Sequence, residues 1–153
     1  MKTNDCLRRL RYILDYGENR MAALFAQGGQ RVSRERVTAL LKKDDDPGFE
    51  ECSDLLFAAF LNGLIAERRG KQEGKALLPE SRLSNNLVLR KLKIAFELRS
   101  EDIQEMLVGQ GVKLSKHELS AFFRRADHKH YRPCKDQVLR KVLAGLQVRV
   151  RGQ

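Results

Sequence analysis

The chain has few cysteines and no long hydrophobic run, and these shortages exclude several classes of protein. Its three cysteines, Cys6, Cys52 and Cys134, are far apart and odd in number, which suits a reducing compartment better than a disulfide-bonded secreted protein. The longest apolar run, residues 55–61, is much shorter than the roughly 20 residues of a transmembrane helix. The first twenty residues alternate charged and apolar side chains, so we expect no signal peptide and a cytoplasmic location.

The motifs of common enzyme classes are also absent from the sequence. Gly109-Gln110-Gly111 lacks the third glycine of a nucleotide-binding loop and follows no strand-like segment, and no Gly-x-Ser-x-Gly occurs. The acidic segment 44–51 lacks the alternating spacing of an EF-hand and is explained by an ordinary polar turn. We therefore expect a protein that is not an enzyme, with no catalytic residue and no cofactor.

What the sequence does contain is a second copy of itself. Shifting the chain by 82 residues aligns 4–70 with 86–152 without a gap, with 15 identical residues among 67 aligned positions. The identities include Asn4/Asn86, Ser33/Ser115, Cys52/Cys134, Asp54/Asp136 and Gly63/Gly145. This alignment indicates a tandem duplication, with a first repeat at 1–70, a linker at 71–85 and a second repeat at 86–153.

Each repeat has the pattern of four helices. Apolar residues recur at helical spacing over about 5–15, 19–27 and 53–69, and again over 87–98, 101–109 and 135–151. Ser33 and Ser115 have the positions of N-caps for a third helix, and Ser115 forms a capping box with Glu118. Gly63 and Gly145 lie inside the last helix, where glycine costs about 1 kcal/mol relative to alanine. Their recurrence predicts close contact with another helix.

The expected fold is all-α, a tandem duplication of a four-helix unit, because no segment alternates like a strand. A unit of this size is only marginally stable alone, so we expect the two repeats to pack with pseudo-twofold symmetry into one compact domain. The second helix of the second repeat is expected to begin after Ser100. In the linker, Leu77, Leu78 and Leu83 are expected to dock against a core.

Several stretches are similar to a known bacterial family. They are residues 4–12, 60–71 and 85–96, and Asp127-His128-Lys129 with Cys134. Together they resemble the YehS-like proteins, whose domain has no assigned function. The resemblance covers nearly the whole chain and implies a small bacterial cytoplasmic protein built from two related halves. It implies no activity and no functional residue.

His128, His130 and Cys134 lie within seven residues and could suggest a zinc site. The repeat argues against that interpretation, because Cys52 aligns with Cys134 and has no histidine in its neighbourhood. A cysteine that recurs without the histidines is better explained as a small buried apolar side chain. We therefore expect no metal.

The net charge of +10 belongs almost entirely to the second repeat. Residues 4–70 of the first repeat include 11 basic and 11 acidic ones, whereas the second repeat has 15 basic and 7 acidic ones. Part of the difference is local, because the acidic segment 44–51 corresponds to a basic, tyrosine-containing segment at 126–133. Basic side chains beside an aromatic ring suit phosphate contact and base stacking, although many charged loops are only solvated.

These observations predict a nucleic-acid-binding module or regulator that acts on RNA or DNA. The candidate residues are Arg124, Arg125, Lys129, Tyr131, Arg132 and Lys135, with a second basic set on the first helix of the same repeat, Arg90, Lys91 and Lys93. A helix-turn-helix fits less well, because about six residues separate the second and third helices. The alternatives are a protein–protein adaptor with one neutral-acidic and one basic half, and self-association through loops of opposite charge.

Overall fold

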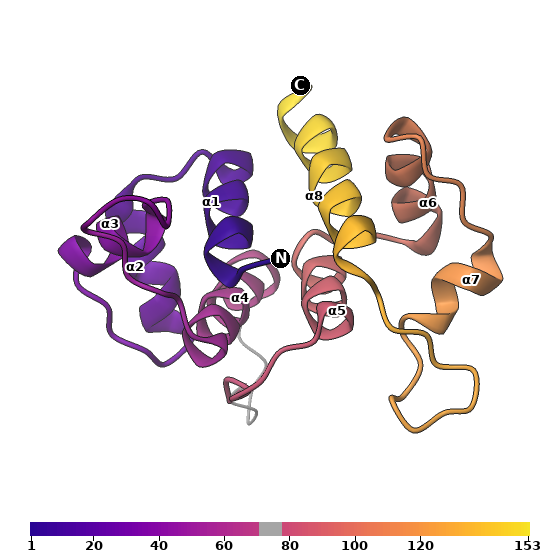
Figure 1. Cartoon of the computed structure of the whole chain (residues 1–153), viewed down its shortest axis with the longest axis horizontal. Helices are drawn as coiled ribbons and strands as arrows, with labels where there is room; N and C mark the ends of the chain where they lie inside the picture. The colour runs from indigo at the N-terminus through magenta and orange to yellow at the C-terminus, as the bar shows by residue number, and fades with distance from the viewer. Residues whose placement is uncertain (71–77) are drawn as a thin grey trace. The chain divides into compact units, whose positions relative to one another are not determined.

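In the computed structural model, which describes residues 1–70 and 78–153, these residues form eight helices and no strand (Figure 1). The chain divides into two compact units, Met1–Leu83 and Ser84–Gln153. The first unit contains α1 (Thr3–Leu14), α2 (Glu18–Gln27), α3 (Arg34–Leu41) and α4 (Asp54–Arg69). The second contains α5 (Asn85–Ala95), α6 (Ser100–Gly109), α7 (Lys116–Ala121) and α8 (Asp136–Arg151). The all-α prediction is confirmed.

The two units repeat the same succession of helices down to single backbone angles. α1 and α5 are both followed by a left-handed residue, Asp15 with φ 59° and Glu97 with φ 52°, at equivalent positions. Gly29 and Gly111 have positive φ just after α2 and α6. The duplication is thereby confirmed in structure as well as sequence. The pseudo-twofold packing of the two repeats stays a prediction.

Serine side chains begin the third helix of each unit, as predicted. Ser33 Oγ accepts a hydrogen bond from the Arg36 N–H at 3.1 Å, and Ser115 Oγ accepts one from the Glu118 N–H at 3.0 Å. The Glu118 carboxylate in turn accepts from the Ser115 N–H at 3.1 Å, which completes the capping box.

Two expectations from the sequence are wrong, one about the start of α6 and one about the linker. α6 begins at Ser100 and not after it, and Arg99 is the N-cap, with its N–H donating a hydrogen bond to the Asp102 carboxylate at 2.7 Å. Leu78 does not dock against a core, since it is 81% exposed. Leu83 is half-buried, and its N–H donates to Asp54 at 2.8 Å, whereas Leu77 lies outside the described residues.

A glycine marks the close approach of the last helix to the second helix in each unit. A Cβ atom on Gly63 would lie 1.8 Å from the carbonyl oxygen of Leu24, and one on Gly145 would lie 2.8 Å from that of Met106. Leu24 and Met106 occupy equivalent positions. The predicted helix–helix contact is therefore confirmed in both repeats.

The two cores are built from different side chains on the same plan. In the first unit, the fully buried rings of Phe25 on α2 and Phe60 on α4 have centroids 5.4 Å apart. The equivalent residues of the second unit are Leu107 and Val142, which are also buried. Because both pairs are apolar and buried, the duplication has kept the pattern of the core while changing its volume.

Candidate nucleic-acid interface

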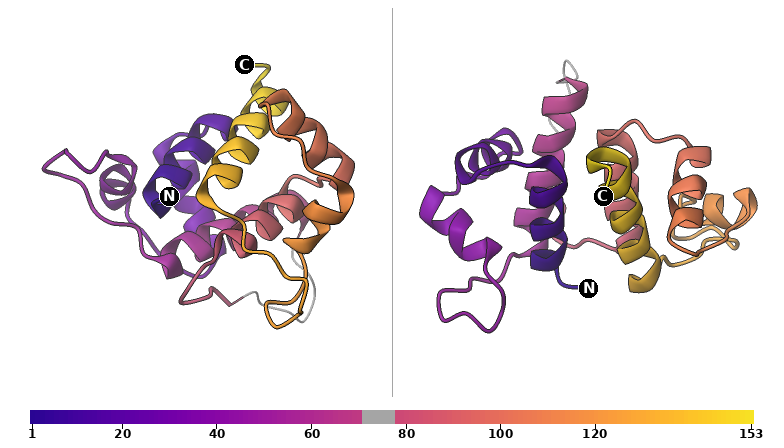
Figure 2. Two further views of the ribbon diagram at one scale, coloured as in Figure 1. Left: turned by 45° about the vertical axis from the view of Figure 1, so that its right-hand side comes forward. Right: turned by 90° about the horizontal axis from the view of Figure 1, so that it is seen from above.

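The candidate residues gather on the segment between α7 and α8, which we call the basic loop (residues 124–135). Its equivalent between α3 and α4 is the acidic loop (residues 42–53). Each loop extends away from the helices of its own unit (Figure 1; Figure 2, left). Both loops contain two successive turns closed by equivalent backbone hydrogen bonds of 2.9–3.0 Å, from Asp46 to Lys43 and Phe49 to Asp46, and from His128 to Arg125 and Tyr131 to His128. The two loops therefore share one backbone frame.

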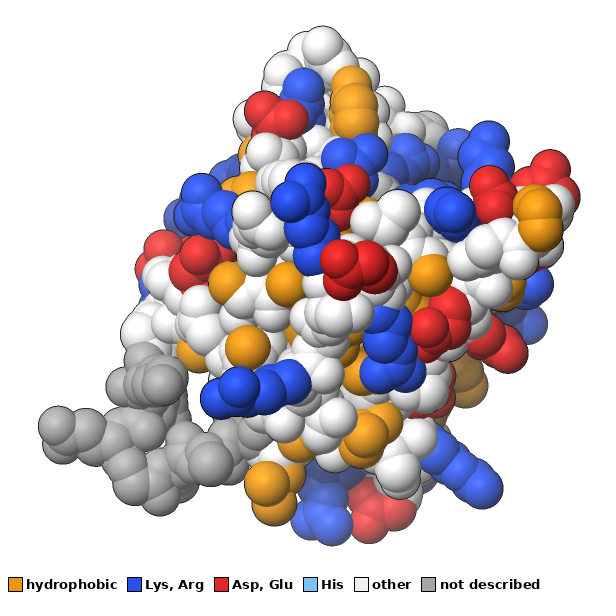
Figure 3. Space-filling view, turned by 90° about the vertical axis from the view of Figure 1, so that its left-hand side faces the viewer, with side chains coloured by type: hydrophobic (Ala, Val, Ile, Leu, Met, Phe, Trp, Pro, Cys, Tyr) orange, Lys and Arg blue, Asp and Glu red, His pale blue; other side chains and the backbone are white. Residues whose placement is uncertain are grey.

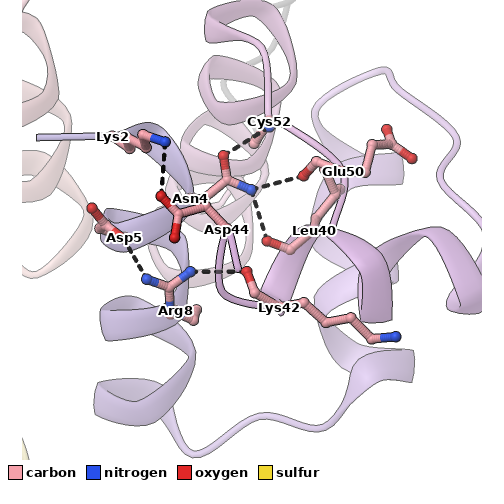
Figure 4. A network of polar contacts seen from close by, with 9 residues as sticks. All are labelled: Lys2, Asn4, Asp5, Arg8, Leu40, Lys42, Asp44, Glu50 and Cys52. Carbon is pink, nitrogen blue, oxygen red and sulfur yellow. Dashed lines mark hydrogen bonds and ion pairs between the residues drawn. The ribbon is translucent and has the colours of Figure 1, made fainter. Parts of the chain in front are cut away.

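A buried asparagine holds the ends of the acidic loop together (Figure 4). Asn4, on α1, donates from Nδ2 to the carbonyl oxygens of Leu40 and Glu50, each at 2.9 Å. Its Oδ1 accepts from the Cys52 N–H at 2.9 Å. One side chain thus satisfies three backbone groups from the end of α3, the loop and the approach to α4, and leaves no amide proton of its own unpaired.

Asn86 does the same in the second unit. Its Nδ2 donates to the carbonyl oxygens of Phe122 at 3.0 Å and Arg132 at 2.8 Å, and its Oδ1 accepts from the Cys134 N–H at 2.8 Å. All four residues are equivalent to those of the first unit. The basic loop is therefore a fixed structure anchored to α5, and its side chains start from defined positions.

The side chains on this common frame have opposite charge. The basic loop carries five Lys or Arg residues and one carboxylate, whereas the acidic loop carries two Lys residues and five carboxylates. An ion pair between the third helix and the loop is reversed as well: Arg36 lies 2.7 Å from Glu50 in the first unit, and the equivalent pair in the second is Glu118 and Arg132 at 3.5 Å. The reversal places the cation of the pair on the basic loop.

The basic loop combines a locked arginine with exposed cations. Arg124 donates to the His130 carbonyl oxygen at 3.0 Å and to Ser120 Oγ at 3.4 Å, so its guanidinium braces the loop. Arg125 is 86% exposed in its side chain and lies 3.4 Å from Asp127. Lys129 and Lys135 are exposed. Tyr131 is only half-buried, and the rings of His128 and His130, with centroids 5.6 Å apart, lie on exposed residues.

The basic set on α5 divides into two parts. Arg90 donates to the carbonyl oxygen of Phe123 at 2.7 Å, and Lys93 Nζ lies 5.2 Å from the centroid of the Phe123 ring. These two cations therefore lie beside the start of the basic loop and extend its positive surface. Lys91 is 7% exposed and does not form part of that surface.

The acidic loop has part of its charge neutralised within its own unit. Lys2 lies 3.0 Å from Asp44, and this pairing lowers the pKa of the Asp44 carboxyl and raises that of the Lys2 amine. Lys42 lies 3.8 Å from Asp46. On the face of the first unit seen in Figure 3, basic and acidic side chains are interspersed, with no broad area of one sign.

The cysteines are buried side chains. Cys52 and Cys134 are 2% and 4% exposed, and burial raises the pKa of their thiols to about 12 and about 11. The expectation of a small buried side chain at this repeated position is confirmed. Among the residues that the structure describes, no three His, Cys, Asp or Glu side chains converge as a metal site.

The role of the two asparagines was not predicted from the sequence. The signal was present, because Asn4 and Asn86 are identical in the repeat alignment and sit on the apolar side of an amphipathic helix. A polar residue that recurs on a buried face requires partners for its amide. The reversed ion pair between the third helix and the loop is harder to predict from the sequence. The alignment shows that the charge changes sign at two positions, but it does not show that the two side chains are in contact.

Comparisons with known proteins identify the family. The family model described as "Protein of unknown function (DUF1456)" matches the chain twice, at residues 3–70 and 85–152. "Uncharacterized protein YehS" of Escherichia coli (strain K12) is 45% identical over 150 residues, which cover 97% of this chain and 96% of that relative. No solved structure matches the chain. None of the helices in the described part of the chain is both long and apolar enough to cross a membrane. The chain belongs to the DUF1456 family, whose domain occurs in it twice, once in each repeat.

Proposed function

We propose that this protein is a nucleic-acid-binding module or regulator that contacts RNA or DNA through the basic loop. The observation that carries the proposal is the reversal of charge on a loop frame that both repeats share. A loop that is only solvated needs no consistent sign of charge. The basic loop has other residues at four of the five positions that carry carboxylates in the acidic loop, and it has three more cations. The added cations give the second repeat a surface for phosphate groups.

The arrangement of the side chains supports contact with a nucleic-acid backbone. Arg125, Lys129 and Lys135 are exposed on the loop, and Arg132 is 58% exposed in its side chain despite its pair with Glu118. Arg90 and Lys93 add positive charge beside the loop. The exposed His128 and His130 rings offer faces on which unpaired bases can stack. The proposal is of a non-enzymatic, cytoplasmic protein without a cofactor.

A binding assay with matched variants tests this proposal. Fluorescence anisotropy with labelled single-stranded and duplex RNA and DNA should show binding at low salt that weakens steeply as salt rises. Arg125→Glu should weaken binding at least about tenfold, because it reverses an exposed cation of the interface. Lys43→Glu changes the equivalent residue of the first repeat and is the matched control, which should leave the affinity within about twofold. Absence of binding to all four probes at low salt would refute the proposal.

A second candidate function is that of an adaptor between proteins, and the acidic loop favours it. Asp45 and Glu51 are exposed there, on a frame that is fixed by Asn4. Crosslinking and copurification from cells, with and without nuclease, separates the two functions. Partners that survive nuclease and are lost when Asp45 and Glu51 are changed to Lys support the adaptor, whereas partners lost on nuclease treatment support nucleic-acid binding.

A further inference from the structure

A second ion pair is reversed between the repeats, and it joins the two helices that pack most closely. In the first unit, Arg20 on α2 lies 3.3 Å from Glu67 on α4. The equivalent residues of the second unit are Asp102 on α6 and Arg149 on α8, which lie 3.2 Å apart. The pair between the third helix and the loop is reversed in the same way. Two ion pairs therefore occur at equivalent places in both repeats with opposite polarity.

Repeats of one scaffold in a single chain are prone to assemble with the wrong partner. Helices from different copies have similar cores, and exchange of equivalent elements between or within chains is a characteristic failure of repeat proteins. Here the crossing of second and last helices uses a glycine in both repeats, Gly63 and Gly145, so no side chain at that position blocks an exchanged pairing. Some other feature must disfavour the exchanged pairings.

The reversed pairs make every exchange of these helices electrostatically unfavourable. If α8 packed on α2, Arg149 would face Arg20, and if α4 packed on α6, Glu67 would face Asp102. The same holds for the loop pair, where Arg36 would meet Arg132. Each native attraction becomes a repulsion on exchange, so the cost of a wrong pairing is the loss of one contact plus the gain of a clash.

The close backbone contact of Gly28 adds to this discrimination at one exchange only. A Cβ on Gly28 would lie 1.8 Å from the carbonyl oxygen of Ala59, and the second repeat has Gln110 at the equivalent position, which hinders α6 from packing on α4. For α2 against α8, the combination is glycine facing the half-buried Lys141, which does not clash in this way. The reversed charges, by contrast, oppose both exchanges.

We infer that the opposite polarity of the Arg20–Glu67 and Asp102–Arg149 pairs, with that of the two loop pairs, specifies helix pairing within each repeat and prevents exchange between repeats. This role is independent of nucleic-acid binding. It predicts that giving both repeats the same polarity permits exchanged dimers even when every native ion pair is retained.

The test converts the first repeat to the polarity of the second in the full chain. The converted variant carries Arg20→Asp, Glu67→Arg, Arg36→Glu and Glu50→Arg. Its native fold should persist, because the carboxylates introduced at positions 20 and 36 would stand in the first turns of α2 and α3, where negative charge is favourable. The carboxylate at position 36 would also give Ser33 the capping box that Ser115 has. The neutral variant, with glutamine at the same four positions, lacks both the attraction and the repulsion.

Each protein is unfolded in urea, refolded at high concentration, and analysed by size-exclusion chromatography with light scattering. Only dimers that persist on dilution at high salt are counted. An exchanged dimer must unfold before it can dissociate, whereas a dimer held only by surface charge dissociates at high salt. The dimer fraction should rise in the order wild type, neutral, converted, with the converted variant roughly tenfold above wild type. A dimer fraction that is highest in the neutral variant, or equal in all three, would overturn the inference. The double variant Arg20→Asp/Glu67→Arg should lie between wild type and converted and serves if the fourfold variant refolds poorly.

Discussion

The side-chain amide of Asn86 lies 2.8 Å from the carbonyl oxygen of Arg132, so a buried residue of α5 holds the backbone of the basic loop. The same amide also binds the Phe122 carbonyl oxygen, and its Oδ1 accepts from the Cys134 N–H. Because Asn4 makes the equivalent three bonds in the first repeat, one asparagine in each unit ties the loop frame to the first helix of that unit.

Asn86→Ala should destabilise the second repeat by about 2–4 kcal/mol, because it leaves three backbone groups, two of them in buried hydrogen bonds, without partners. Asn4→Ala should have a similar effect on the first repeat. Urea unfolding followed by circular dichroism measures both. Asn19→Ala, at an exposed position, is the control and should change stability by less than about 0.5 kcal/mol. A cost below about 1 kcal/mol for Asn86→Ala would show that water replaces the asparagine.

The two helical glycines should tolerate alanine to different degrees. Gly63→Ala should cost about 3 kcal/mol or more, because the new Cβ would overlap the Leu24 carbonyl oxygen and the helices must separate. Gly145→Ala should cost about 1–2 kcal/mol, since its closest contacts are at 2.8 Å. Gly109→Ala is the control, because that position at the end of α6 has no neighbour within 4 Å and no positive φ. Urea midpoints that are equal for the first two variants would contradict the difference in packing.

The helices, the serine caps and the helix-crossing glycines could be predicted because each is a local signal that the repeat presents twice. The predicted start of α6 was one residue too late, because the start depends on which backbone N–H finds a partner, and Asp102 binds that of Arg99. Leu78 was expected in a core on its apolarity alone, and apolar residues also occur on surfaces. The asparagine anchors and reversed ion pairs depend on contacts between residues far apart in the chain, which the sequence pattern does not show.

The second repeat should lose stability on acidification. The hydrogen bond from the Arg99 N–H, with Arg149 nearby, lowers the pKa of Asp102, and that from the Ser115 N–H lowers the pKa of Glu118. A carboxyl with a lower pKa in the folded state adds stability above its unfolded pKa, about 4, and this contribution is lost as the pH falls through the folded pKa. Urea midpoints should therefore fall below about pH 4.

Asp102→Asn and Glu118→Gln should each flatten that acid dependence while lowering stability at neutral pH. Glu105→Gln, at an exposed residue of the same helix as Asp102, should leave the profile unchanged. If the profiles of the first two variants ran parallel to that of the wild type, these carboxylates would not be the groups whose protonation destabilises the repeat.

The cysteines should react only when the protein unfolds. The thiolate is the reactive form, and burial raises the pKa of Cys52 to about 12 and of Cys134 to about 11. An aromatic disulfide reagent at about pH 8 should label the native protein slowly, at a rate that follows the unfolding equilibrium as urea is added. Labelling of native protein at the speed of a free thiol would show that one of these side chains reaches solvent.

The ion pair of the basic loop allows the charge of that loop to be changed without removing the pair. Glu118→Arg together with Arg132→Glu gives the second repeat the polarity of Arg36 and Glu50 and moves the cation from the loop to α7. Loss of the capping box should cost about 1 kcal/mol. Nucleic-acid affinity should fall several-fold, and the slope of log affinity against log salt should become shallower by about 1, the contribution of one phosphate contact. Arg36→Glu/Glu50→Arg makes the converse change in the first repeat and should not weaken binding. Neither double variant changes the net charge of the chain, so equal losses in the two would mean that the charge carried by the basic loop does not govern the interaction.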